Sequence, residues 1–159
     1  MTTQTSVENG NLTVVRTYSA PIEKVFDAWI QTSKIKNWWG CAECTDVRSE
    51  VEPKVGGKYN HHMTIDTPAG QHEVEGFATL VEYDPPKRLA YTSNDIEDKM
   101  LITVDFVEVP EGTQVTLVHA NIPDMKVQGD VKLSDVITGG WSAALEKLDI
   151  FLNSEKQAS

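Results

Sequence analysis

One stretch near the N-terminus constrains the fold more than any other: a predicted strand that runs directly into a helix. Leu12 to Tyr18 carries β-branched side chains and is expected to form the strand. Pro21 stands where a first helical residue would, because its missing N–H has no intrahelical partner there anyway. Ser19, just before it, is a suitable N-cap. Helical spacing to about Gln31 predicts a buried face formed by Val25, Phe26 and Trp29.

Strand signals dominate the middle of the chain, after a second, short helix expected from Ser33 to about Trp38. Strand-like segments separated by Gly- or Pro-containing turns predict six further strands, at residues 45–52, 58–66, 71–83, 88–93, 99–109 and 113–120. A long helix is expected from about Val131 to Leu152, because its apolar residues have the spacing of a helix that lies on a sheet. This order predicts an α+β fold, with an antiparallel sheet and its helices on one face.

Length and composition fit one domain with a single core, since 40% of the 159 residues are hydrophobic. Residues 11–153 are predicted to form this domain, with a disordered polar tail at 1–10 and a frayed end at 154–159. The net charge of −10 and the scattered Lys and Arg residues disfavour nucleic acids and anionic membranes as partners. No apolar run reaches the roughly 18 residues of a membrane span, and the polar start does not have the form of a signal peptide. We therefore expect a cytoplasmic protein without membrane insertion.

Four motifs of this chain together resemble one known family. The first is Arg16-x-x-x-Ala20-Pro21-x-x-x-Val25-Phe26-x-Ala28-Trp29 followed by Trp38-Trp39-Gly40. The other three are Val55-Gly56-Gly57-Lys58-Tyr59, Glu82-Tyr83-Asp84-Pro85-Pro86-Lys87-Arg88-Leu89 and Gly140-Trp141-x-x-x-Leu145-x-x-Leu148-x-x-x-Leu152. They resemble the family named after the activator of heat-shock protein 90 ATPase, over about residues 11–153.

The resemblance implies the helix-grip fold of the START-like (SRPBCC) superfamily. In that fold a curved antiparallel sheet, here of about six to seven strands, wraps the long C-terminal helix and often leaves an apolar cavity. Two short helices follow the first strand. Members of the superfamily bind lipids, hormones or polyketides, and a few are enzymes. The four motifs consist mostly of packing and turn residues, so they specify a fold rather than a function.

The residues expected to line such a cavity are aromatic or lie at inward-facing strand positions. Ligand cavities are usually lined by apolar and aromatic surface with a few polar groups that orient the ligand. Gly139 and Gly140 interrupt the long helix, which gives room either for close backbone approach or for a cavity between helix and sheet. The candidate ligand-binding residues are Trp38, Trp39, Tyr59, His61, Met63, Tyr91, Phe106, His119 and Trp141.

His61 and His119 are the histidines of this set, because strand alternation places both on inward faces. An inward histidine could orient a ligand or transfer a proton near neutral pH. It could equally be a core residue bonded to a neighbour. His62 is expected to point outward and His72 lies beside a turn, and the sequence identifies no partner for either.

Cys41 and Cys44 have the spacing of a zinc or redox pair, but the surrounding sequence supports neither role. A structural zinc site needs four ligands, and the chain has no second cysteine pair. The motif follows a helix C-terminus, whereas a helix N-terminus is what lowers a thiol pKa. No metal or other cofactor is therefore predicted. Asp105 and Glu75 are expected to face solvent, so no paired catalytic carboxylates emerge and no catalytic residue is assigned.

Three functions are compatible with these observations. The first is binding of a small hydrophobic or aromatic molecule between the sheet and the C-terminal helix. The second is a cyclase- or hydrolase-like enzyme with a cavity histidine as general base, which would need His61 or His119 within hydrogen-bond reach of a carboxylate or tyrosine. The third is a protein-interaction domain, with a chaperone as one possible partner, which would expose a contiguous apolar patch.

Overall fold

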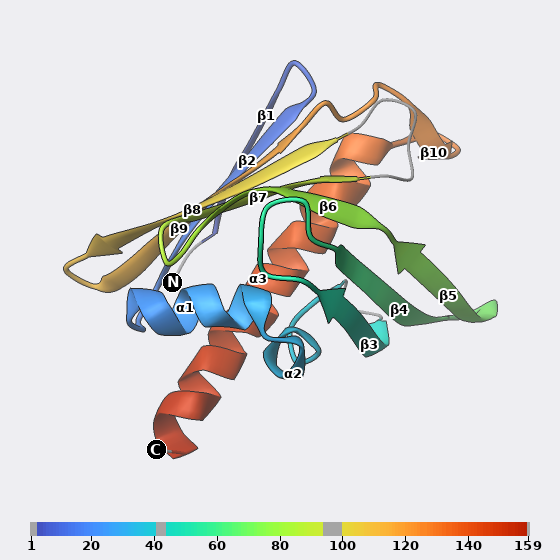
Figure 1. Ribbon diagram of the computed structural model, residues 1–159. Coiled ribbons are helices and arrows are strands. Elements are labelled where there is room, and N and C mark those ends of the chain that lie inside the picture. The colour runs from blue at the N-terminus through green and yellow to red at the C-terminus, as the bar shows by residue number, and fades with distance from the viewer. Residues whose placement is uncertain (1–2, 41–43, 94–99, 159) are drawn as a thin grey trace.

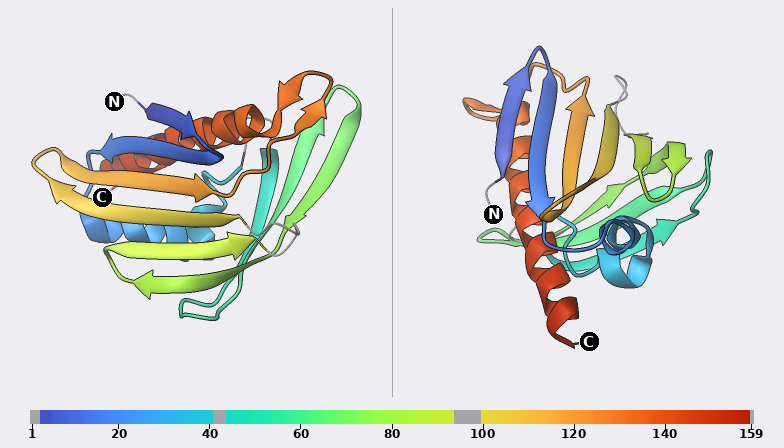
Figure 2. Two further views of the ribbon diagram at one scale, coloured as in Figure 1. Left: turned by 90° about the horizontal axis from the view of Figure 1, so that it is seen from above. Right: turned by 90° about the vertical axis from the view of Figure 1, so that its left-hand side faces the viewer.

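The computed structural model describes residues 3–40, 44–93 and 100–158. Curved antiparallel sheets are crossed on one side by the long C-terminal helix α3 (Leu133–Ala158), as Figures 1 and 2 show. Two short helices, α1 (Ile22–Ile30) and α2 (Thr32–Ile35), follow one another directly, and α1 contacts α3. This architecture confirms the α+β helix-grip fold expected from the sequence.

The larger sheet has six antiparallel strands in the order β1-β2-β9-β8-β7-β6. These strands are β1 (Gln4–Glu8), β2 (Asn11–Tyr18), β6 (Ala78–Asp84), β7 (Arg88–Ser93), β8 (Leu101–Val109) and β9 (Gly112–Ala120). Every second residue of β2 and β9 is buried, because one face of this sheet carries the core and the other faces solvent.

A smaller antiparallel sheet contains β3 (Cys44–Val51), β4 (Tyr59–Thr67) and β5 (Gly70–Gly76), in that order. A β-bridge between Lys58 and Thr79 is one of the contacts that join it to the larger sheet. A third pair of strands, β10 (Lys126–Gln128) and β11 (Val131–Lys132), forms a short ribbon immediately before α3. Met63 of the smaller sheet and the N-terminal part of α3 line a common pocket, which is described below.

The segment 71–83, expected as one strand, is two strands that belong to different sheets. β5 ends at Gly76 and pairs with β4, whereas β6 begins at Ala78 and pairs with β7. The prediction of one strand is therefore wrong. Both halves contain strand-forming residues, so local pattern does not mark where the partner strand changes. At that point the backbone N–H of Ala78 donates to the side-chain oxygen of Asn60, at 3.1 Å.

The termini are more ordered than their polar composition suggested. Residues 4–8 form β1, an edge strand paired with β2, where a disordered tail was expected. All five side chains of β1 are exposed, so main-chain hydrogen bonds to β2 hold it rather than apolar burial. At the other end, α3 continues to Ala158 beyond the expected end of the domain. It also begins two residues later than expected, because residues 131–132 belong to β11.

The start of α1 differs in detail from the prediction. Pro21 occupies the N-cap position rather than the first helical position, with φ −62° and ψ 150°, and no side chain caps the helix. The Pro21 carbonyl accepts the backbone N–H groups of Lys24 and Val25, both at 3.1 Å. Ser19 lies too far upstream of the helix to act as its cap. The short helix α2 ends at Ile35, and Trp38, expected to be its last residue, lies in the turn that follows.

From Ala144 to Leu152, α3 is fixed tightly to the core. Its apolar stripe is buried at Ala144, Leu145, Leu148 and Leu152. Two polar contacts with β2 add to this packing: the Tyr18 hydroxyl donates to the Leu145 carbonyl at 3.0 Å, and Arg16 pairs with Asp149 at 2.8 Å. The N-terminal half is packed less completely, since Val136 is 50% exposed.

Candidate functional site

A mainly apolar pocket of about 250 Å³ lies where the N-terminal half of α3 faces the sheets. We refer to it as the α3 pocket. The helix contributes one wall, formed by Val136, Ile137, Gly140, Trp141 and Ala144. The opposite wall comes from the loop after α2 and from strands β4 and β9, and consists of Trp39, Gly40, Met63 and His119.

Gly140 determines how much space the α3 pocket has. A Cβ atom at this position would meet no other heavy atom within 4 Å, so the helix stands away from the sheets there. Gly139 also has open space around it, but it is exposed and does not line the pocket. Of the two glycines that suggested a cavity, Gly140 is therefore the one that borders it.

His119 is held in one tautomer by two neighbours. The Trp141 indole N–H donates to His119 Nδ1 at 2.9 Å, and an indole nitrogen can only donate. Nδ1 therefore carries no proton, and the ring N–H lies on Nε2, which is 3.0 Å from the Met100 sulfur. Burial lowers the pKa of His119 to about 4, so its imidazole is neutral near pH 7.

His61 lies beside the α3 pocket, behind the Trp39 indole. The two rings are stacked, with centroids 3.8 Å apart and planes inclined by 23°. His61 Nδ1 is 2.8 Å from the Ser49 hydroxyl on the neighbouring strand, and its Nε2 is buried with no hydrogen-bond partner among the described residues. Burial lowers the pKa of His61 to about 3, so this imidazole is also neutral near pH 7.

Of the nine predicted ligand-binding residues, four line the α3 pocket: Trp39, Met63, His119 and Trp141. His61 is separated from it by Trp39. The other four, Trp38, Tyr59, Tyr91 and Phe106, are buried in the core and are not part of the pocket wall. Strand alternation indicates which face a side chain takes, but it does not indicate how deeply that side chain lies.

Two of these core residues have polar ends that are already bonded within the protein. The Trp38 indole N–H donates to the Ala28 carbonyl at 2.9 Å. The Tyr59 hydroxyl donates to the Trp29 carbonyl at 2.7 Å. Both contacts fix α1 and the turn after α2 against the smaller sheet, which makes packing the role the structure shows for Trp38 and Tyr59.

Sequence reasoning missed Gly40, Val136, Ile137 and Ala144 as wall residues. Ile137 and Ala144 belong to the apolar stripe of α3, so that stripe could have suggested them. Gly40 ends the Trp-Trp-Gly motif and has φ +90°, a conformation that favours glycine. A Cβ atom there would lie 2.9 Å from the Met63 sulfur and 3.0 Å from the Cys44 sulfur.

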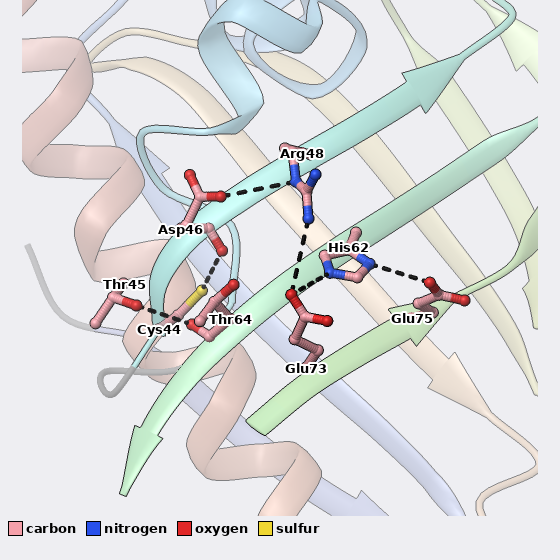
Figure 3. Close-up of polar contacts among 8 residues, drawn as sticks. All are labelled: Cys44, Thr45, Asp46, Arg48, His62, Thr64, Glu73 and Glu75. Carbon is pink, nitrogen blue, oxygen red and sulfur yellow. Dashed lines mark hydrogen bonds and ion pairs between the residues drawn. The ribbon is translucent and has the colours of Figure 1, made fainter. Parts of the chain in front are cut away.

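The opposite face of the smaller sheet is polar and carries an exposed ion-pair cluster (Figure 3). His62 projects from this face, as expected, and lies 3.4 Å from Glu73 and 3.3 Å from Glu75. Arg48 lies 3.8 Å from Asp46 and 3.9 Å from Glu73. The partners of His62 thus come from β5, which the sequence could not show. Exposed pairs of this kind contribute little to stability.

Two further hollows are larger than the α3 pocket but are less suitable for an apolar ligand. One, of about 380 Å³, lies at the smaller sheet and is bordered by Arg48, Ser49, His61, His62 and Glu75 among other residues. The other, of about 650 Å³, lies beside the start of α1 and is bordered by Lys87 and Arg88 among other charged residues. In that second hollow, Arg88 is already paired with Asp105 at 2.9 Å. In the α3 pocket, by contrast, none of the wall residues carries a formal charge near pH 7.

Only one cysteine of the Cys41–Cys44 pair can be assessed as a metal ligand. Cys41 lies outside the described residues. The Cys44 thiol donates to the Asp46 carbonyl at 3.4 Å. Within the described ranges, no group of three or more His, Cys, Asp or Glu side chains is arranged to hold a metal ion.

A long helix gripped by curved antiparallel sheets, with an apolar pocket beside it, defines a START-like helix-grip domain. Residues 19–153 match the family described as Activator of Hsp90 ATPase homolog 1-like protein. The chain belongs to this family, and the resemblance seen in its sequence motifs is confirmed.

Solved structures of similar proteins support the fold. Protein NE0264 from Nitrosomonas europaea has 19% sequence identity and a TM-score of 0.75, covering 95% of this chain and 99% of that one. A protein from Rhodobacter sphaeroides has 20% identity and a TM-score of 0.79, with coverage of 96% and 99%. An AHSA1-like protein from Aeromonas hydrophila has 21% identity and a TM-score of 0.70, with coverage of 92% and 94%. No curated protein matches the chain. Among the described residues, no helix is long and apolar enough to cross a membrane.

Proposed function

We propose that this protein binds a small, uncharged hydrophobic or aromatic molecule in the α3 pocket. The observation that carries the proposal is the open space at Gly140, in a helix whose other half is packed tightly. Glycine in a helix interior costs about 1 kcal/mol relative to alanine. Retaining it at a pocket wall fits a requirement for space.

The chemistry of the wall supports an uncharged ligand. Trp39 and Trp141 present aromatic surface, and Met63 adds an adaptable apolar side chain. His119 is neutral, and both of its ring nitrogens already face protein partners. A buried charge on the ligand would therefore find no counter-ion among these residues. The net charge of −10 further disfavours an anionic ligand.

The two alternative functions have less support. An enzyme with a histidine base would need a carboxylate or tyrosine partner, but the described polar contacts of His61 and His119 are with Ser49, Met100 and Trp141. Membership of the family leaves a chaperone interaction possible, and no observation in the structure favours it. A cytoplasmic location stays a prediction from the sequence.

We expect Gly140→Leu to abolish ligand binding without unfolding the protein, because a Cβ atom there meets no heavy atom within 4 Å and Gly140 borders the α3 pocket that the longer side chain would occupy. Gly140→Ala should raise the free energy of unfolding by about 1 kcal/mol through helix propensity. Binding is measured by two-dimensional NMR with small aromatic probes such as naphthalene and indole, following the Trp141 indole signal. Stability is measured by urea unfolding.

Gly139→Leu is the matched control, because it makes the same replacement one residue away on the exposed side of α3. It should retain binding of the probes. The proposal fails if no uncharged aromatic or aliphatic probe binds the wild-type protein. It fails equally if Gly140→Leu binds the probes as well as Gly139→Leu does.

A further inference from the structure

His61 has a buried polar atom that the protein leaves without a partner. The residue is only 5% exposed, and its Nε2 has no hydrogen bond among the described residues. Most buried polar atoms are bonded, and an exception calls for an explanation. The other ring nitrogen is satisfied by Ser49, so the His61 ring is held in place with Nε2 uncommitted.

His61, which carries this unpartnered Nε2, lies next to two residues that line the α3 pocket. His61 and Met63 are two residues apart on β4, so their side chains project from the same face of the strand. Met63 lines the pocket, and the Trp39 indole, which also lines it, stacks on the His61 ring. Trp39 thus stands between the pocket and His61, which on its other side borders the polar hollow at the smaller sheet.

Trp39 differs from Trp38 and Trp141 in how its side chain is held, since its ring packs against Trp29, Trp38, Tyr59, His61 and Trp141 without an indole hydrogen bond to any described residue. The indole N–H of Trp38 donates to Ala28, and that of Trp141 donates to His119. Trp39 is partly exposed, and within the described ranges its indole N–H makes no hydrogen bond. Ring contacts hold it, and the ring of an aromatic ligand could replace its stack on His61.

We propose that the ligand of the α3 pocket carries a hydroxyl group at its buried end, and that this hydroxyl pairs with His61 Nε2 when the ligand ring replaces the Trp39 indole. This inference rests on the proposed function and makes His61 the residue that determines specificity. A hydroxyl suits the site because it both donates and accepts. The Ser49 hydroxyl can likewise donate to or accept from Nδ1. Both ring nitrogens of His61 would therefore be hydrogen-bonded in either tautomer. A charged group would be buried without a counter-ion.

The test compares two probes that differ by one hydroxyl, naphthalene and 2-naphthol, on the wild-type protein and on His61→Phe. The wild-type protein should bind 2-naphthol about tenfold more tightly, as one net hydrogen bond to a buried atom allows. His61→Phe should retain affinity for naphthalene and lose the preference. His61→Gln, whose amide can occupy the position of Nε2, should restore part of it.

A second measurement reports the displacement of Trp39 directly. With 5-fluorotryptophan incorporated, the fluorine signal that disappears in Trp39→Phe is the signal of residue 39. Binding of 2-naphthol should shift this signal more than that of Trp38. If it stays fixed while the Trp141 signal moves, the displacement is refuted.

The outcomes separate this inference from the proposed function. If neither probe, nor any other uncharged probe, binds the wild-type protein, the proposed function itself fails. If naphthalene binds but the wild-type protein shows no preference for 2-naphthol, the inference about His61 is overturned and the pocket stands. The same conclusion follows if the preference persists in a folded His61→Phe, since another group, or a trapped water at Nε2, then accounts for it.

Discussion

Replacing Asp149 with alanine should lower the free energy of unfolding by about 3 kcal/mol, the lower end of the loss expected when one partner of a buried ion pair is removed, because the Asp149 side chain is 19% exposed. Asp149 lies on α3 and accepts from Arg16 on β2 at 2.8 Å. Arg16 is only 7% exposed, and its Nε already has no partner among the described residues. Without Asp149, the guanidinium keeps a contact with Thr3 and a position over the Tyr18 ring, and has no carboxylate partner. Urea unfolding followed by circular dichroism measures the change.

The double variant Arg16→Met with Asp149→Leu separates loss of the pair from loss of packing. It removes both charges while retaining apolar volume, and it should recover most of the stability lost in Asp149→Ala. Asp130→Ala breaks the exposed pair with Lys126 and should leave the urea midpoint unchanged. An Asp149→Ala variant as stable as the wild-type protein would show that Arg16 is adequately solvated without its partner.

This ion pair also explains why the pocket occurs at one end of α3. Arg16 and Tyr18 both contact the C-terminal half of the helix, at Asp149 and Leu145. Towards the N-terminus, Trp141 donates to His119 and the Leu133 backbone N–H donates to the Met125 carbonyl, while Gly140 presents no side chain to the sheets. The helix is therefore held at one half and leaves space at the other.

The sequence was sufficient to predict the fold because its motifs consist of residues that build the fold. Val25, Phe26 and Trp29 are spaced for one face of a helix, and all three are buried in the structure. Leu145 and Leu148 likewise identified the face of α3 that packs on the sheet. Such periodic signals need only local sequence, which is why they were read correctly.

The remaining features depend on partners that are distant in the chain. Arg16 and Asp149 are 133 residues apart, and no local pattern links them. The change of sheet near Phe77 depends on which strand lies beside each half of the segment, so alternation within it gave no sign of the break.

The site itself was predictable only in part. His61 and His119 were correctly placed on inward faces, and both are buried. The sequence could not show that Trp141 bonds to His119 while Trp39 covers His61, because these contacts depend on where α3 and the loop after α2 settle.

Acidification should destabilise the protein through these same two histidines. Burial lowers the pKa of His61 to about 3 and that of His119 to about 4, from an ordinary value of 6.5. Between these values and 6.5, the unfolded chain binds protons that the folded protein does not. Their contribution to stability is thus complete above about pH 6.5 and is lost as the pH falls towards 4 and 3. Together they should remove about 2 kcal/mol between about pH 6 and about pH 5.

The measurement is the free energy of unfolding in urea as a function of pH. Because acidic residues also titrate at the lower end of this range, the pH dependence is compared between variants rather than interpreted for the wild-type protein alone. His61→Asn and His119→Asn should each remove about half of the slope near pH 5, even where the cavity they create lowers stability at every pH. Gln71→Asn is the control, since it changes an exposed and uncharged side chain of β5, and it should leave the slope unchanged. A slope that survives in both buried-histidine variants would mean that these imidazoles become protonated in the folded state. The neutral state of His119 in the pocket wall, on which the choice of an uncharged ligand partly rests, would then not hold below about pH 6.5.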